Sequence, residues 1–495
     1  MLSGAQVETL AEKVYRILED IGFLVENETL TEIMLRKGCT PASDRRVTIP
    51  RSLVEEMVSF QKQTQAQNAR DMELVPLCGP DWTHHIIWNQ QQEQMRARLK
   101  REFLMPAFDC GPTVYYDYVN GQPKSVDTEI FDMMMKFAEA TPEIGYTSTW
   151  YRQDVPPMIE RLDSLARGMR LTRKLDGIEV IYLEVVKYLQ AASEIITGRQ
   201  GDSSFLAGSE CITMPLILER RSAEDVLARK EAGVHRYHIA SMPTMGINTP
   251  VTVAGSIVMG AAEILGGMAA CWCADPEADL SGRMITLLVD MRNANSTPTG
   301  PETCLYELGV KQLFDELWGG HCMVETFFSP GASKPGLQAV FENFFGSYNR
   351  ALWEGRPDIP YAGMGTLHNG GLGSPTQFML DLEIRKAEWF DRTISVDDDS
   401  IDFEEICERI RQRTDFLASD HTLSHFRKLW TSKVFMSESP HGGGAWDGTE
   451  KAILDKCEEM WRANIAQWKP PEWPEETLRA IDALVLRAKR EFGIS

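Results

Sequence analysis

The chain has 495 residues, of which 43% are hydrophobic, and it carries 51 basic against 72 acidic residues, a formal net charge of −21 at pH 7. This acidic balance argues against nucleic acid and anionic membranes as the main partners, because both are bound through basic surface. The ten cysteines include no Cys-x-x-Cys pair, and residues 1–4 lead directly into an amphipathic segment, so we expect free thiols, no signal peptide and a cytoplasmic protein.

The N-terminal region is predicted to be mostly helical. Apolar residues recur at helical spacing over 4–20 and 28–37, and a third helix is expected from 52 to 61 after a short extended piece at 47–50. We expect residues 1–104 to form a cap. The segment that follows ends in Asn120-Gly121, the strongest short hairpin signal, and predicts a β-ribbon.

From residue 126 onward, strands and helices alternate. The expected strands are 144–149, 178–183, 204–209, 236–241, 279–284, 322–327 and 361–366. The expected helices are 127–140, 157–171, 184–198, 222–232, 251–273, 302–318, 336–350 and 375–390. Such alternation predicts a parallel sheet, and seven or eight units predict an α/β fold of the TIM-type (β/α)8 barrel class within residues 105–395. The eighth strand has two candidates, first residues 433–436 and second the 104–118 region.

After the barrel, residues 396–495 are predicted to be helical. The expected helices are 402–414, 420–430, 449–466 and 473–491. We expect this C-terminal region to pack on the barrel or on a partner subunit. The chain is therefore predicted to be a barrel with helical N- and C-terminal additions.

The segment 251–273 contains a single charge, Glu263, and is long enough to satisfy a hydropathy window for a membrane span. It is rich in Gly and Ala and stands alone in a chain of ordinary polarity, which favours a helix buried in a soluble protein. Thr249-Pro250 is typical of a helix start, with a hydroxyl N-cap followed by a proline in the first turn. The loop before this helix is where we expect the active site.

Barrel enzymes place their functional groups at the C-terminal ends of the strands, and aromatic residues occur at one of these ends. Trp150 and Tyr151 follow the strand 144–149. At a barrel mouth such rings can surround a quaternary ammonium by cation–π attraction, and Tyr116 of the ribbon could supply a further wall. Packing in the core is the alternative for all three rings.

Other strand ends supply polar and aromatic candidates but no nucleophile–base pair. His368-Asn369 follows the strand 361–366, and the imidazole can donate a hydrogen bond to an anionic or carbonyl group, unless it is a loop histidine without a role. Glu325 lies beside Phe327 and Phe328, which either pack in the core or wall an apolar pocket. His421 and His425 share a helix face, but without a thiolate or a metalloprotease glutamate we expect no metal site.

Several segments resemble the trimethylamine methyltransferase family. They are 242–256 with 262–267, 298–302, 331–342 with Lys334-Pro335, 420–426 and 434–446. The resemblance covers roughly residues 105–490 and is most specific at Pro250-Val251-Thr252.

This resemblance implies a TIM-type barrel that demethylates amines and passes the methyl group to the Co(I) corrinoid of a separate corrinoid protein, so that the chain itself binds no cofactor. Archaeal trimethylamine members carry pyrrolysine at a position that falls near Phe327 or Phe328, and no pyrrolysine occurs here. The chain is therefore similar to the branch that acts on glycine betaine and other quaternary amines. A homo-oligomer is expected.

A quaternary nitrogen leaves as a neutral tertiary amine and needs no general acid, so the enzyme has to desolvate and aim the methyl group. For a substrate carboxylate, the candidates are the N–H groups that start at Pro250, Val251 and Thr252, with Arg283 or His368. Two alternatives stay open. One is a methyltransferase for a tertiary methylamine with Glu325 or His368 as the acid, and the other is a non-catalytic betaine-binding barrel. Which quaternary amine is used also stays open.

Overall fold

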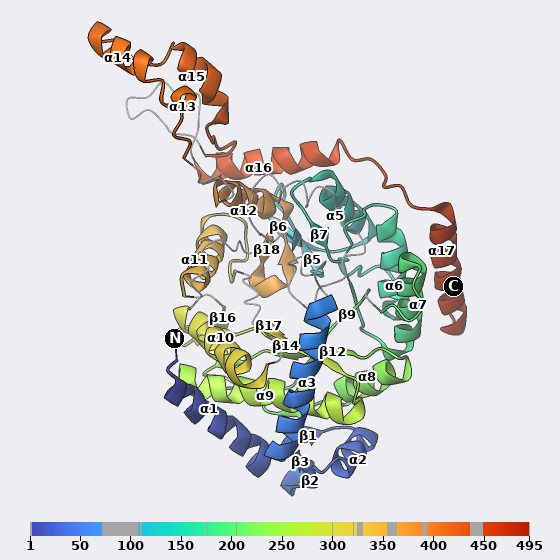
Figure 1. Ribbon diagram of the computed structural model, residues 1–495. Coiled ribbons are helices and arrows are strands. Elements are labelled where there is room, and N and C mark those ends of the chain that lie inside the picture. The colour runs from blue at the N-terminus through green and yellow to red at the C-terminus, as the bar shows by residue number, and fades with distance from the viewer. Residues whose placement is uncertain are drawn as a thin grey trace.

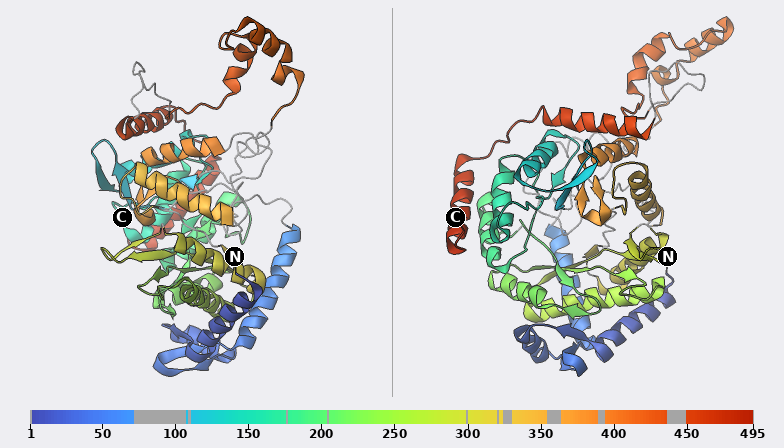
Figure 2. Two further views of the ribbon diagram at one scale, coloured as in Figure 1. Left: turned by 90° about the vertical axis from the view of Figure 1, so that its left-hand side faces the viewer. Right: turned by 180° about the vertical axis from the view of Figure 1, so that it is seen from behind.

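The computed structural model describes residues 2–71, 107–108, 111–175, 177–203, 205–298, 300–319, 321–323, 330–353, 364–388, 394–435 and 449–494. Within these ranges, one group of helices surrounds a set of parallel strands, and further helices from both ends of the chain pack on the outside (Figures 1 and 2).

The N-terminal region consists of helices and a small sheet. Its elements are α1 (Gly4–Arg16), the π-helical turn η1 (Ile17–Ile21), β1 (Phe23–Val25), α2 (Glu28–Arg36), β2 (Thr40–Pro41), the turn η2 (Ser43–Arg45), β3 (Arg46–Thr48) and α3 (Arg51–Asp71). A capping box between Ser3 and Gln6 starts α1. β1 pairs antiparallel with β3 and parallel with β11 (Ile217–Leu218), a strand nearly 200 positions later. The N-terminal segment is thus joined to the middle of the chain by a sheet.

The central region alternates strands and helices, as the sequence predicts. Its strands are β4 (Ala107–Phe108), β5 (Val114–Asp117), β6 (Gln122–Ser125), β7 (Tyr146–Thr147), β8 (Ile178–Glu179), β9 (Leu206–Ala207), β10 (Glu210–Ile212), β12 (Arg236–Ser241), β13 (Thr244–Met245), β14 (Asp279–Met284), β15 (Leu287–Asp290), β16 (Asn295–Thr297), β17 (His321–Met323), β18 (Thr366–Leu367) and β19 (Leu372–Gly373). Its helices are α5 (Thr128–Ala140), α6 (Pro157–Met169), α7 (Val186–Thr197), α8 (Arg220–Glu231), α9 (Val253–Ala274), α10 (Pro301–Leu313), α11 (Leu337–Trp353) and α12 (Pro375–Glu388), with the turns η3 (Leu183–Val185), η4 (Phe314–Trp318) and η5 (His368–Gly370).

Parallel pairing links most of the inner strands. β4 pairs with β7, a bridge joins Thr147 to Leu175, β8 pairs with β9, and β10, β12, β14 and β17 form one four-stranded parallel sheet. Helices α5 to α12 lie around these strands when the molecule is seen from the front and from behind (Figures 1 and 2). Within the described residues the hydrogen-bonded pairs do not close into one sheet, so the (β/α)8 barrel remains a proposal.

The two candidates for the eighth strand differ in the structure. β4 lies in the 104–118 region and pairs with β7 as a barrel strand would. The first candidate was residues 433–436. The structure describes residues 433–435 of this segment, and they form no strand. The predicted hairpin is confirmed, because β5 and β6 pair antiparallel around Asn120-Gly121, where Gly121 adopts φ of +65°.

The apolar helix α9 is a core element. It is long and apolar enough to cross a membrane, but 89% of its most apolar window is buried inside the protein. It packs in one hydrophobic core with α1, β1, α3, β12, β14 and α10. A Cβ added at Gly266 would lie 2.1 Å from Cε2 of Phe23, and one at Gly267 would lie 2.6 Å from Cγ2 of Ile239. The prediction of a buried helix is confirmed, and its glycines permit close contact on two sides.

The start of α9 differs from the sequence prediction. The helix begins at Val253 with Thr252 as N-cap, three residues after the predicted cap Thr249. The Thr249 hydroxyl instead lies 2.8 Å from the hydroxyl of Ser256, which donates a hydrogen bond to the carbonyl oxygen of Pro250. The loop therefore folds over the first helical turn, and the Thr249 hydroxyl is engaged by Ser256 instead of capping the helix.

The C-terminal region comprises α13 (Asp398–Ile401), α14 (Phe403–Gln412), α15 (Asp420–His425), the turn η6 (Phe426–Lys428), α16 (Glu450–Ile465) and α17 (Glu475–Glu491). α16 and α17 pack on the body, where Trp461 is fully buried and the Tyr188 hydroxyl of α7 donates to Glu491 at 2.6 Å. They complete a second core with β4, α5, α6, α7 and α12. α13, α14 and α15 instead project from the body (Figures 1 and 2).

Candidate functional site

Polar side chains of β12 and β14 share the face of the parallel sheet that points away from the helices. Ile239 and Leu280 pack in the core with α9, and successive side chains of a strand point to opposite faces. His238 and Ser281 are paired across the two strands, with 2.7 Å between Nδ1 of the imidazole and the hydroxyl oxygen. Arg283 follows Ser281 on the same face. The predicted residue Arg283 therefore lies next to a histidine that the sequence did not single out as a site.

This face carries two arginines, Arg236 and Arg283, with Asp279 in register with Arg236. Burial, together with the smaller effect of the positive charges of Arg283, Arg236 and Arg229, lowers the pKa of His238 to about 3. The imidazole is therefore neutral at pH 7, while the guanidinium groups stay charged. A neutral imidazole beside an arginine is an arrangement that suits a carboxylate ligand.

A second cluster lies where β7 and β8 end. The Tyr151 hydroxyl donates a hydrogen bond to Oε2 of Glu179, and the guanidinium carbon of Arg161 lies 3.6 Å from the centroid of the tyrosine ring. Burial and then the charge of Glu179 raise the pKa of Tyr151, so its hydroxyl stays protonated. Gly111 adopts φ of +51°, and a Cβ there would lie 2.9 Å from Cε2 of the ring. The tyrosine is thus held on several sides.

Helix α6 fixes the position of this tyrosine. Arg161 donates to the carbonyl oxygens of Thr149 and Trp150 at 3.2 and 3.1 Å, and it pairs with Glu160 in the same turn. Glu160 in turn accepts from the backbone N–H of residue 152 at 3.0 Å. Buried charges held by several hydrogen bonds resist movement. Side chains of α6 therefore hold the backbone just before Tyr151 in place.

The other two aromatic candidates lie in hydrophobic clusters. Trp150 is 1% exposed and its ring centroid is 5.2 Å from that of Phe108, while its indole N–H has no hydrogen-bond partner among the described residues. Tyr116 is buried in a separate small cluster with Leu367 and Leu372. Their part in an ammonium cage stays a prediction.

His368 and Asn369 lie at the end of β18, as predicted. Both are exposed and adopt left-handed φ values of +49° and +56°. Their backbone N–H groups donate to the carbonyl oxygens of Ala332 and Pro330 at 2.9 and 3.0 Å. This contact joins the loop after β18 to the segment that follows residues 324–329. The candidates Glu325, Phe327 and Phe328 lie outside the described residues.

The loop before α9 is open to solvent. Pro250, Val251 and Thr252 are exposed, and the Thr252 side chain makes no capping hydrogen bond. The strands β13 and β15 pair and so hold this loop beside the hairpin of β15 and β16. Large apolar side chains on these loops are 50–83% exposed. They are Met242, Ile247, Val251 and Met291. We call these four residues the apolar rim.

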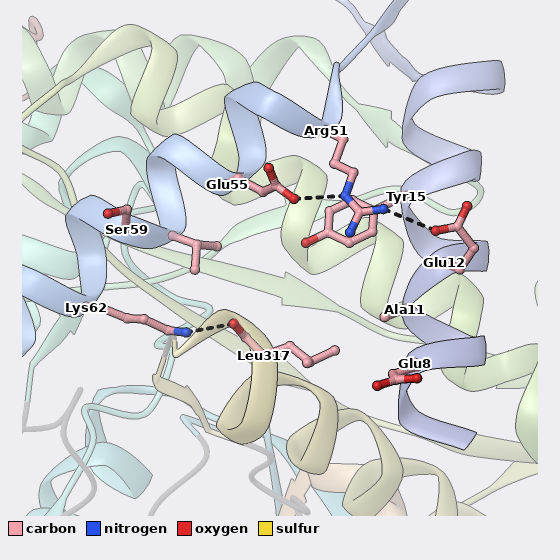
Figure 3. A pocket seen from close by; sticks show the side chains of 10 residues that line it. Glu8, Ala11, Glu12, Tyr15, Arg51, Glu55, Ser59, Lys62 and Leu317 are labelled. Atoms are coloured by element: carbon pink, nitrogen blue, oxygen red, sulfur yellow. Dashed lines mark hydrogen bonds and ion pairs between the residues drawn. The ribbon is translucent and has the colours of Figure 1, made fainter. Parts of the chain in front are cut away.

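A groove of about 560 Å³ lies elsewhere, between α1 and α3 in the N-terminal region (Figure 3). Arg51 lies 4.3 Å from the ring centroid of Tyr15 and pairs with Glu12 and Glu55 (Figure 3). Since these charged groups satisfy one another, the groove presents no reactive arrangement.

Metal-ligating side chains do not gather in the part of the chain that the structure describes. No group of three His, Cys, Asp or Glu side chains able to hold a metal occurs there. His421 and His425 stack with ring centroids 4.3 Å apart, and Nε2 of His425 lies 3.2 Å from Asp399.

Glu179, Arg161 and His238 join the candidate site without having been predicted. The strand predicted at 178–183 ends at Glu179 in the structure, so the sequence placed Glu179 inside a strand rather than at its end. His238 could have been found from the alternation along β12, which separates it from its core-facing neighbours.

Comparison with known proteins identifies the family. The family model for trimethylamine methyltransferase (MTTB) matches residues 90–493. A glycine betaine methyltransferase of Desulfitobacterium hafniense (strain Y51) is 21% identical over 517 aligned positions, covering 100% of this chain and 98% of the relative. Trimethylamine methyltransferase MttB of Desulfitobacterium hafniense (strain DSM 10664 / DCB-2) is 24% identical over 369 positions, covering 68% of this chain and 71% of the relative. The predicted resemblance is confirmed, and the chain belongs to the trimethylamine methyltransferase (MTTB) family.

Proposed function

We propose that this chain transfers a methyl group from a quaternary amine, with glycine betaine as the first candidate, to the Co(I) corrinoid of a separate corrinoid protein in the cytoplasm. The observation that carries the proposal is the match over the full length of a relative named glycine betaine methyltransferase. The absence of pyrrolysine from the sequence supports a quaternary amine as the substrate in preference to trimethylamine.

The ammonium group is proposed to bind at Tyr151 and Glu179. The Arg161 guanidinium covers one face of the Tyr151 ring, so a second cation is confined to the opposite face or to the ring edge. A desolvated cation–π contact contributes about 2 kcal/mol. The Glu179 carboxylate adds a negative charge beside the ring.

The substrate carboxylate is proposed to bind at Arg283, with the neutral imidazole of His238 on the same face. The two clusters would then select a molecule with a cation at one end and an anion at the other. Each cluster is held by hydrogen bonds within the fold, which orients the substrate before reaction.

The proposed reaction requires little proton transfer by the residues of this chain. The Co(I) corrinoid supplies the nucleophile when its carrier protein is docked. The amine leaves as a neutral tertiary amine, so the residues of this chain bind the substrate, orient its methyl group and exclude water. The apolar rim fits the docking of the carrier protein, since exposed apolar patches mark interaction sites.

The test is methylation of a reduced corrinoid protein from the same organism, followed by its visible spectrum. Glycine betaine should convert the Co(I) form to the methylated form, and proline betaine, carnitine and butyrobetaine serve as competing substrates. Turnover with a tertiary methylamine alone would favour an acid-assisted reaction through Glu325 or His368. Binding of betaine without transfer to any corrinoid protein would instead favour a non-catalytic binding barrel.

A further inference from the structure

Residues 394–430 form an arm that stands away from the rest of the chain (Figures 1 and 2). It contains α13, α14, α15 and η6. Among the described residues, side-chain hydrogen bonds and ion pairs of the arm join residues within the arm, such as Arg409 to Glu405 and His425 to Asp399. The chain rejoins the body at Ser432 and Lys433, which both donate to Glu383 of α12.

The arm has no hydrophobic core of its own. Ser419 is the sole buried residue in the described range 394–430, and eleven large apolar side chains there are 42–84% exposed. They are Ile394, Val396, Ile401, Phe403, Ile410, Phe416, Leu417, Leu423, Phe426, Leu429 and Trp430. Short helices gain most of their stability in proteins by packing an apolar face. The arm therefore needs a surface that covers it.

The exposed area is large enough for a stable association. A large apolar side chain exposes about 150–200 Å² when free, so eleven partly exposed ones present on the order of 1,000 Å². A standard protein interface buries about 800 Å² on each partner. The arm alone thus offers the surface of one complete interface.

The apolar residues of α14 follow one stripe. Phe403, Ile406, Cys407 and Ile410 occupy positions i, i+3, i+4 and i+7, which fall on one face of a helix. Phe403 and Ile410 at the two ends of the stripe are exposed. This spacing is typical of a helix that lies against a second helix or in an apolar groove.

A matching stripe lies on the body. On α11, Leu337, Phe341 and Phe344 occupy positions i, i+4 and i+7 and are 74%, 61% and 42% exposed, while Ala339 and Asn343 on the opposite side are buried. α11 and α14 lie at separate places in both figures (Figures 1 and 2). One chain therefore displays both stripes without bringing them together.

We propose that two copies of this chain exchange arms, so that α14 of each copy packs on α11 of the other. A two-fold axis generates both contacts at once, because each copy supplies one arm and one acceptor helix. The arm carries nine acidic against five basic residues between positions 394 and 430, which disfavours an anionic membrane as the covering surface. The proposal goes beyond methyl transfer and does not depend on it.

The test measures the mass of the full-length protein in solution by light scattering after size exclusion at micromolar concentration. The expected mass is an even multiple of the 55.9 kDa chain. Two variants test the contact from its two sides: the double variant Phe403→Glu/Ile410→Glu on the arm, and the single variant Phe341→Glu on α11. Each should weaken association roughly a hundredfold or more, because it places an unpaired charge in the buried contact. Val119→Glu, at a 67% exposed apolar position outside both stripes, is the matched control and should leave the mass unchanged.

A crosslinking experiment identifies the pairing. Phe341→benzoylphenylalanine is introduced into a mixture of ¹⁴N and ¹⁵N chains, and irradiation should join it to peptides of residues 403–412 in hybrid ¹⁴N/¹⁵N products. A monomer, a multimer that survives both sets of charged variants, crosslinks confined to one chain, or a monomer that binds anionic vesicles through the arm would each overturn the proposal. Circular dichroism of each variant excludes unfolding as the cause of a lower mass.

Discussion

Tyr151 contributes a ring to the candidate site and a hydroxyl that donates to Glu179. If the ring binds the ammonium, Tyr151→Phe should raise KM for glycine betaine by less than about fivefold, because the π face is kept. Tyr151→Ala should raise KM about 30-fold, the equivalent of about 2 kcal/mol. Initial rates of corrinoid methylation measure both. Tyr188→Phe, whose hydroxyl bonds Glu491 on the outer helices, is the control, and equal effects of all three changes would contradict a cation–π contact.

Glu263 joins α9 to the end of β12 and to the loop before β11, accepting from the Ser241 hydroxyl at 2.5 Å and from the Leu216 N–H at 3.0 Å. Burial raises its pKa from 4.5 to about 7. Between these values the folded state keeps a proton that the unfolded state has lost, so stability falls as pH rises through this window. When the pH rises from 4.5 to 7, we expect the free energy of unfolding of the unchanged protein to fall by up to about 3 kcal/mol more than that of the Glu263→Gln variant, which has no titrating group at this position. Urea titrations at several pH values measure it, and parallel pH profiles would argue against the shift.

At the scale of elements, the glycines of α9 determine how closely the N-terminal segment packs. A Cβ at Gly266 would lie 2.1 Å from Cε2 of Phe23. We therefore expect Gly266→Ala to destabilise the protein by about 1–3 kcal/mol through overpacking, although alanine favours a helix by about 1 kcal/mol. Gly4→Ala in α1, where a Cβ meets nothing within 4 Å, is the matched control and should be neutral or stabilising. Urea unfolding distinguishes them, and a stabilised Gly266→Ala would rule out this packing.

At the scale of the whole molecule, the first three helices are part of a core that they share with α9 and α10. Removal of residues 1–57 would uncover the apolar face of α9 and break the pairing of β1 with β11. We expect the shortened chain to aggregate, because exposed apolar surface of this extent is not tolerated in a monomer. Size exclusion and thermal unfolding test this expectation. A soluble remainder with a cooperative transition would show instead that the N-terminal region is a separable cap.

The sequence predicted features that depend on local pattern. The Asn120-Gly121 hairpin, the burial of α9 and the position of His368 after a strand were all derived from spacing and turn chemistry, and the structure contains each of them. The helix start at Thr249 was wrong, because the hydroxyl of that residue bonds Ser256 rather than a backbone N–H.

The candidate site depends on contacts across strands. Tyr151 meets Glu179 over 28 positions, and His238 meets Ser281 over 43. The His238–Ser281 pair is decided by the register of β12 and β14, where a shift of one residue would turn a side chain to the opposite face. Tyr151 reaches Glu179 from the loop after β7, and the path of that loop depends on tertiary packing. A single sequence carries no direct signal for register.

By itself, the sequence determined the alternation of strands and helices, the buried apolar helix and membership of the MTTB family, because periodicity and local motifs are properties of neighbouring residues. Only the tertiary structure decided that Tyr151 joins Glu179 and that His238 and Arg283 share one face of the sheet. It also decided that residues 394–430 leave the body with their apolar side chains uncovered. These outcomes depend on how distant segments pack, since burial of one segment is set by the surface that another segment offers.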